Sequence, residues 1–154
     1  MTVQIYLKDS VRYYFLNLNR DGKINKTTVI GSAILNMLMA QPIELDSHFE
    51  FKKGKVLDKS ITTLRFHTNI NVTEQQTLSL AQIIEKTFLH DLRNFAELYK
   101  SIDDTISYRE IVRLFFKRHE IPAECLYDEL YFESYIKVRQ WREAKQTNET
   151  IQIS

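Results

Sequence analysis

The chain has 154 residues, with 21 Lys and Arg against 20 Asp and Glu, and 44% of its residues are hydrophobic. This composition predicts a folded chain of ordinary domain size and excludes the strongly basic character that makes nucleic-acid binding an immediate inference. The one cysteine, Cys125, cannot form an internal disulfide, and no apolar run of about 18 residues predicts a membrane span. Because no basic region followed by an apolar one opens the chain, we expect an intracellular, cytoplasmic protein.

The first 40 residues predict one strand and two helices. Residues 3–7 alternate as a strand does, and Asp9 or Ser10 can cap the short amphipathic helix that follows. Residues 19–22 read Asn-Arg-Asp-Gly and predict a turn. A threonine at the start of residues 27–39 opens a second, more apolar helix.

The middle of the chain changes from a strand pattern to a helix pattern. Residues 43–68 predict two strands around a Lys53-Gly54-Lys55 turn. Residues 73–76 read Thr-Glu-Gln-Gln and form a capping box, in which threonine and glutamine each satisfy a backbone N–H of the other. The apolar residues from Leu80 to Tyr99 repeat at helical spacing, so we expect a long helix here.

Two further helices are predicted in the last third. A capping box at Ser107–Glu110 opens a helix that runs to His119, and residues 120–122 form a corner. Pro122 suits the first turn of a final helix over residues 123–145. A helix, a three-residue corner and a second helix form the outline of a helix-turn-helix.

Together these elements predict an α+β fold, with a small antiparallel sheet packed against about five helices and a helix-turn-helix-like pair at the end. We expect a single domain over residues 1–145 and a loose tail over residues 146–154. No repeat or linker divides the chain.

No local pattern predicts catalysis, a metal site or a cofactor. The four histidines, His48, His67, His90 and His119, are not spaced with other ligands in a recognised pattern, and Cys125 stands among acids that would raise the pKa of its thiol. The three glycines form no phosphate-binding loop. We therefore expect a protein that is not an enzyme and has no small-molecule substrate.

The basic residues of the two last helices predict contacts with DNA phosphates. Three of them repeat every four residues along one helix, and others follow near the end of the next helix, so each group can form a positive stripe. The predicted DNA-binding residues are Arg109, Arg113, Lys117, Arg118, Lys137, Arg139 and Arg142.

An acidic stretch separates these two groups of cations. Residues 120–133 contain five acids and no Lys or Arg. Glu124, Asp128 and Glu129 would stand at the start of a recognition helix, where they would repel phosphates. The alternative is that the acids simply complement the macrodipole of the final helix.

Tyrosines at four-residue intervals give the final helix a second candidate surface. Tyr127, Tyr131 and Tyr135 form a row, and Trp141 adds ring surface nearby. Tyrosine and tryptophan are enriched at protein interfaces. The other interpretation is a tyrosine-rich edge packed on the same chain, with each hydroxyl reaching water. These four residues are the predicted protein interface.

The chain resembles small, uncharacterised accessory proteins of bacterial phages and mobile elements. The resemblance lies in the opening segment Gln4-Ile5-Tyr6-Leu7-Lys8-Asp9-Ser10-Val11, in Tyr108-Arg109-Glu110-Ile111, and in the aromatic and basic residues 131–142. It implies an accessory or regulatory protein encoded by a phage or mobile element, with DNA-binding control as one expected role and no family catalytic residue to carry over. The alternative is a structural, assembly or adaptor protein, a homo-oligomer or virion component, that uses the tyrosine surface.

Overall fold

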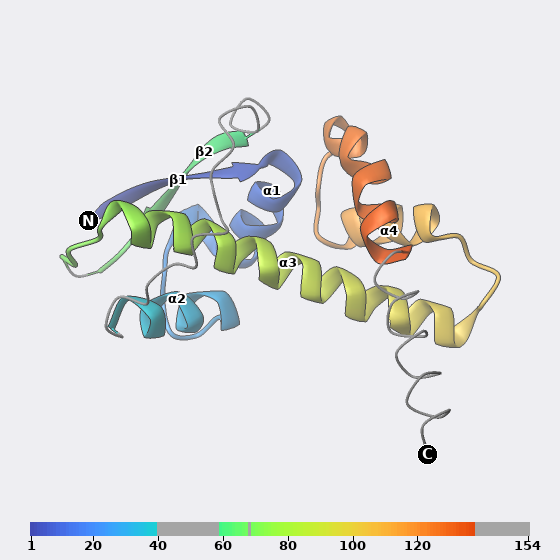
Figure 1. Cartoon of the computed structure of the whole chain (residues 1–154), viewed down its shortest axis with the longest axis horizontal. Coiled ribbons are helices and arrows are strands. Elements are labelled where there is room, and N and C mark those ends of the chain that lie inside the picture. The colour runs from blue at the N-terminus through green and yellow to red at the C-terminus, as the bar shows by residue number, and fades with distance from the viewer. Residues whose placement is uncertain (40–58, 68, 138–154) are drawn as a thin grey trace, which may run out of the picture. The chain divides into compact units, whose positions relative to one another are not determined.

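The computed structural model describes residues 1–39, 59–67 and 69–137 (Figure 1). Contacts within the chain group it into two compact units, Met1–Leu89 and His90–Ser154. The long helix α3, Glu74–Ile102, contributes to both units. The α+β class predicted from the sequence is confirmed. The prediction of one domain over residues 1–145 stays a prediction, and the tail at residues 146–154 lies outside the described residues.

The N-terminal unit contains a two-stranded antiparallel sheet. Strand β1, Thr2–Lys8, pairs with β2, Lys59–Arg65, in a register that joins Thr2 to Arg65 and Lys8 to Lys59. Strand β2 coincides with the second strand predicted within residues 43–68. The first strand of that predicted pair and the turn at residues 53–55 lie outside the described residues.

Two helices and a turn connect the strands along the described chain. Helix α1, Asp9–Leu18, follows β1 directly and is succeeded by the 3₁₀ turn η1, Arg20–Gly22, and by α2, Val29–Met39. Thr28 begins α2, because its hydroxyl accepts the backbone N–H of Gly31 at 3.0 Å. The predicted cap of α1 is wrong: its N-cap residue is Lys8, with no side-chain cap, and the Asp9 carboxylate accepts a hydrogen bond from the Ser60 hydroxyl.

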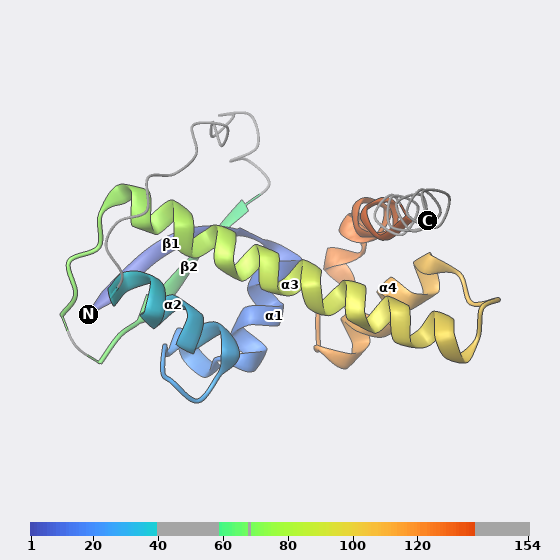
Figure 2. The same ribbon diagram turned by 60° about the horizontal axis from the view of Figure 1, so that its bottom comes forward.

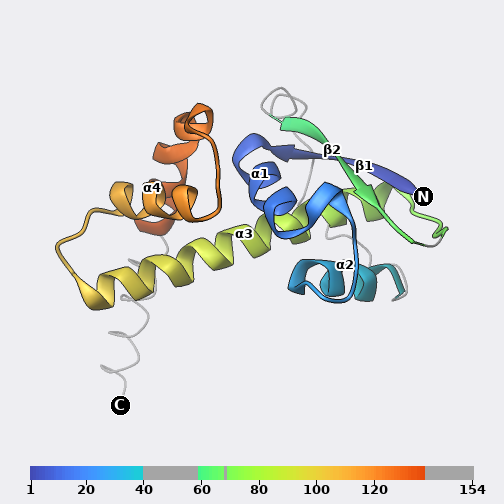
Figure 3. The ribbon, with the colours of Figure 1, turned by 180° about the vertical axis from the view of Figure 1, so that it is seen from behind.

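One side of the sheet carries the core of the N-terminal unit. Figures 1, 2 and 3 show α1 and the first half of α3 on this side. The ring of Tyr14 meets that of Phe88 edge-on, with 5.1 Å between the centroids, and thereby joins these two helices. The buried side chains of the unit include Ile5, Leu7, Tyr14, Phe15, Ile34, Leu64, Leu80, Ile84 and Phe88.

The predicted start of α3 is confirmed in atomic detail. Gln76 N donates to the Thr73 hydroxyl at 3.2 Å, and Thr73 N donates to the Gln76 side-chain oxygen at 2.9 Å, so both halves of the capping box form. The buried stripe of the helix runs through residues spaced by four, which keeps one face toward each core as the helix advances. These residues are Leu80, Ile84, Phe88, Leu92 and Ala96.

Helix α4, Tyr108–Arg118, begins and ends with regular caps. The Ser107 hydroxyl accepts the N–H of Glu110 at 3.1 Å, as predicted. At the other end, Glu120 has a positive φ of 55° and Ile121 N donates to Phe116 O at 2.8 Å. This is a Schellman motif, in which a left-handed residue ends the helix and the apolar residue after it packs back.

The segment after the corner differs from the predicted helix over residues 123–145. Ala123–Asp128 forms the 3₁₀ helix η3, and the α-helix begins at residue 129 and is described to residue 137. The bond from Cys125 N to Pro122 O, at 3.0 Å, spans three residues and begins the tighter winding. Two of the acids expected to reach out from the helix start are buried here, Asp128 and Glu129.

Candidate functional site

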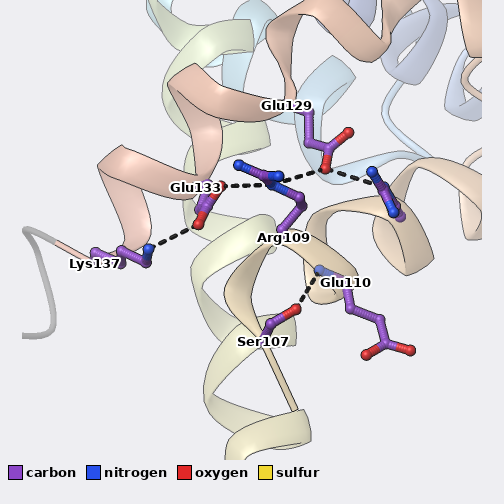
Figure 4. Close-up of polar contacts among 7 residues, drawn as sticks. Ser107, Arg109, Glu110, Glu129, Glu133 and Lys137 are labelled. Atoms are coloured by element: carbon purple, nitrogen blue, oxygen red, sulfur yellow. Dashed lines mark hydrogen bonds and ion pairs between the residues drawn. The ribbon is translucent and has the colours of Figure 1, made fainter.

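An ion-pair cluster joins α4 to the helical residues 129–137 (Figure 4). Arg109 Nε lies 3.4 Å from Glu129 Oε1 and 3.2 Å from Glu133 Oε2, and Arg113 Nε lies 3.0 Å from Glu129 Oε1. Lys137 Nζ lies 2.7 Å from Glu133 Oε1. Each helix contributes residues four apart, so two matched stripes of opposite charge face each other. We call these five residues the ion-pair cluster.

Glu129 is the centre of the cluster because its side chain is only 8% exposed. A carboxylate removed from water to this extent requires compensating charge, and two partly exposed arginines supply it. The contact of Glu129 Oε1 with Arg113 lacks the geometry of a directed hydrogen bond, so the attraction is mainly coulombic. Removing both arginines would leave this carboxylate buried without a counter-charge.

Glu133 extends the cluster toward solvent. The hydrogen bond from Lys137 lowers the pKa of the Glu133 carboxyl below its ordinary value, and the hydrogen bond from Arg109 Nε acts in the same direction. Glu133 therefore stays ionised in mildly acidic solution. Its carboxylate contacts Arg109 of α4 and Lys137, which lies one turn later on its own helix.

The structure brings some of the predicted DNA-binding residues together and separates others. Arg109, Arg113 and Lys137 belong to the ion-pair cluster, where they pair with two carboxylates of the same unit. Lys117 and Arg118 are exposed at the end of α4. The other two predicted residues, Arg139 and Arg142, lie outside the described residues.

The predicted protein interface is described in part. Tyr131 is 47% exposed and Tyr135 is half-buried, whereas Trp141 and the side chain of Tyr127 lie outside what the structure describes. Leu130, beside Tyr131, is 60% exposed. The buried Phe132 ring contacts the Tyr131 ring at 5.1 Å between centroids, which anchors the exposed tyrosine to the core.

Glu129 has a contact that the sequence did not predict. It was expected either to repel phosphates or to complement the helix macrodipole, and in the structure it pairs with Arg109 and Arg113 of the preceding helix. A signal was present: Arg109 and Arg113 have the same spacing as Glu129 and Glu133. Two such stripes on consecutive helices joined by a tight corner favour each other.

Two other kinds of site are absent from the described part of the chain. No group of three or more His, Cys, Asp or Glu residues there is placed to hold a metal ion. No helix among the same residues is both long and apolar enough to cross a membrane. The chain matches no protein-family model, no curated protein and no solved structure.

Proposed function

We propose that the protein is a non-catalytic assembly or adaptor protein whose C-terminal unit binds another copy of the chain through the exposed surface of Leu130 and Tyr131. The observation that carries this proposal is the contrast between two faces of one short helix. Its glutamates pair with cations of the same unit, while the side chains of Leu130 and Tyr131 face solvent.

The arrangement has the composition of a small protein interface. Tyrosine is enriched at interface centres, and charged residues are common at the rim. Lys137 follows Leu130 by seven residues and therefore lies on the same side of the helix, so a charged rim borders the apolar pair. The ion-pair cluster fixes this helix on α4, which lowers the entropy cost of presenting the surface.

Sedimentation velocity over a concentration series tests self-association directly. We expect the wild-type protein to sediment as a larger species as concentration rises, and the variant Leu130→Glu/Tyr131→Ser to remain a monomer. The matched control is Leu98→Gln/Ile102→Gln, which removes two exposed apolar side chains from α3 and should associate like the wild type. A wild-type monomer at the highest soluble concentration would contradict the proposal, as would unchanged association of the Leu130/Tyr131 variant.

DNA binding through phosphate contacts is the second candidate, and the exposed Lys117 and Arg118 favour it. Neither residue takes part in the ion-pair cluster. If the two side chains contact phosphates, Lys117→Ala/Arg118→Ala should weaken duplex binding and reduce the slope of log affinity against log salt by about 0.9 per lost contact. The triple variant of Arg109, Arg113 and Lys117 tests the predicted stripe, and full retention of DNA by both variants would contradict this candidate.

A further inference from the structure

The two-stranded sheet of the N-terminal unit has an outer face on its solvent side. This face takes no part in the ion-pair cluster, in the Leu130/Tyr131 surface or in the candidate DNA contacts of Lys117 and Arg118. Because successive side chains of a strand point to opposite faces, the burial of Ile5, Leu7 and Leu64 places the intervening residues outward. In the centre of this outer face Tyr6 pairs in register with Ile61, and they are 45% and 52% exposed.

Cations lie at both ends of the outer face. Lys8 and Lys59 are register partners at one end. At the other end Arg65 is joined to Lys23 by a parallel bridge, so these two exposed side chains stand on the same face. The outward positions, none of which is an acid, are Thr2, Gln4, Tyr6, Lys8, Lys23, Lys59, Ile61, Thr63 and Arg65.

The pair at the Arg65 end differs from the cations of the ion-pair cluster. Within the described part of the chain, neither Lys23 nor Arg65 takes part in a salt bridge. Both are nevertheless held in place by backbone bonds, since Ile24 N donates to Arg65 O at 2.8 Å and Lys23 N donates to Arg20 O at 3.1 Å. Two exposed positive side chains on a held backbone therefore face solvent, four register positions along the strands from the partly exposed Tyr6 ring.

We propose that this outer sheet face binds a single-stranded nucleic acid, with an unpaired base stacked on Tyr6 beside Ile61 and the phosphate backbone held by Arg65 and Lys23. The charge sign calls for a polyanion, and the flat ring between cations favours one whose units carry exposed bases. From Thr2 to Lys8 the strand spans about 20 Å, which accommodates a few nucleotides. The proposal rests on the N-terminal unit alone and is independent of self-association.

Fluorescence anisotropy with a labelled oligothymidylate of about 12 nucleotides tests the proposal on the full chain. We expect binding at low salt. The variant Lys23→Glu/Arg65→Glu should lose at least about tenfold in affinity, and the slope against log salt should fall by about 0.7 per lost phosphate contact. The matched control, Lys26→Glu/Lys86→Glu, changes two exposed cations of the same unit that are not among the outward sheet positions, and it should bind the oligonucleotide like the wild type.

Tyr6 provides the test of stacking. Tyr6→Ala should weaken binding by about 5- to 150-fold, the range expected for loss of one stacked base, whereas Tyr6→Phe keeps the ring and should bind like the wild type. Both changes are made at a partly exposed side chain, and circular dichroism checks that the fold is kept. If Lys23→Glu/Arg65→Glu fails to fold, the comparison of Tyr6→Ala with Tyr6→Phe decides alone.

Three further ligands distinguish this proposal from other polyanions. A duplex of equal length, a phosphatidylserine vesicle and poly-glutamate should each bind more weakly than the single strand at the same salt. Equal binding of any one of them would overturn the proposal, because charge alone would then account for the affinity. Absence of oligonucleotide binding at low salt, or equal binding by Tyr6→Ala and wild type, would overturn it as well.

Discussion

Two groups of cations, one in each unit, differ in whether acidic side chains pair with them in the described part of the chain. In the C-terminal unit, Arg109 and Arg113 are bound by glutamates of the next helix, and their charge stabilises the unit. In the N-terminal unit, Lys23 and Arg65 stand on an outer sheet face whose positions carry no acid. The comparison shows that regular spacing of arginines along a helix is a poor guide to an available positive surface. Whether the arginines remain available depends on the side chains that the neighbouring helix places against them.

The largest contrast should come from removing two cations from each unit. Arg109→Ala/Arg113→Ala leaves the buried Glu129 carboxylate without its two arginines and should lower the free energy of unfolding by about 3 kcal/mol. Lys23→Ala/Arg65→Ala should change it by less than about 0.5 kcal/mol, because both side chains are exposed. Urea denaturation measures both values, and equal losses would contradict the comparison.

Replacing a glycine in the N-terminal unit should have the next largest effect on the free energy of unfolding. Gly22 has a φ of 72°, and a Cβ at this position would lie 2.1 Å from the Thr63 carbonyl oxygen. Gly22→Ala should therefore displace the turn from β2 and lower the free energy of unfolding by about 2 kcal/mol. The neighbouring change Asp21→Gly, at another residue with positive φ, serves as the control and should not destabilise the unit. A neutral Gly22→Ala would show that the turn adapts without cost.

The corner after α4 offers a stabilising change. Glu120 adopts the left-handed conformation that glycine adopts without strain. Glu120→Gly should raise the free energy of unfolding by about 0.5–1 kcal/mol, and Glu120→Asn should give a smaller gain because asparagine tolerates this region better than glutamate. Thermal denaturation compares the three proteins. A loss of stability in Glu120→Gly would mean that the glutamate side chain contributes more than the strain it introduces.

The smallest predicted effect is a pH dependence in the C-terminal unit. Burial lowers the pKa of His119 below its ordinary value, with Arg118 acting in the same direction and Asp91 opposing it. His119 therefore binds a proton more readily in the unfolded chain than in the folded one. The stability that comes from keeping this side chain neutral is fully present above about pH 6.5, and it is lost as pH falls through the lower pKa of the folded state. His119→Phe should remove this fall and keep the ring packing on Phe115. The control variant His90→Gln should keep the loss of stability at low pH.

Local signals predicted most of the fold because each depends on residues close in sequence. The caps at Thr73 and Ser107 form as their spacing required, and the four-residue apolar repeat marked the core face of α3. The failures involve residues far apart in the chain. Asp9 does not cap α1 because its carboxylate accepts the Ser60 hydroxyl, 51 positions away.

The candidate site was predictable only in its composition. Spacing indicated a basic stripe and a tyrosine row, but the ion pairs join residues 16 to 24 positions apart across a corner whose geometry the sequence does not specify. The outer sheet face depends on the register between β1 and β2, which brings Tyr6 to Ile61. With residues 9–58 between these strands, no local pattern sets that register.

The continuity of α3 has a consequence for dissecting this protein. The border between the two units falls between Leu89 and His90, inside a helix of 29 residues rather than in a loop. Within a helix, each amide N–H around that border donates to a carbonyl four residues earlier, so expressing either half alone would strip several of these bonds and end the fragment in the middle of a turn. Fragments intended to isolate one half should therefore retain α3 in full, and mild proteolysis should spare this border while cutting elsewhere.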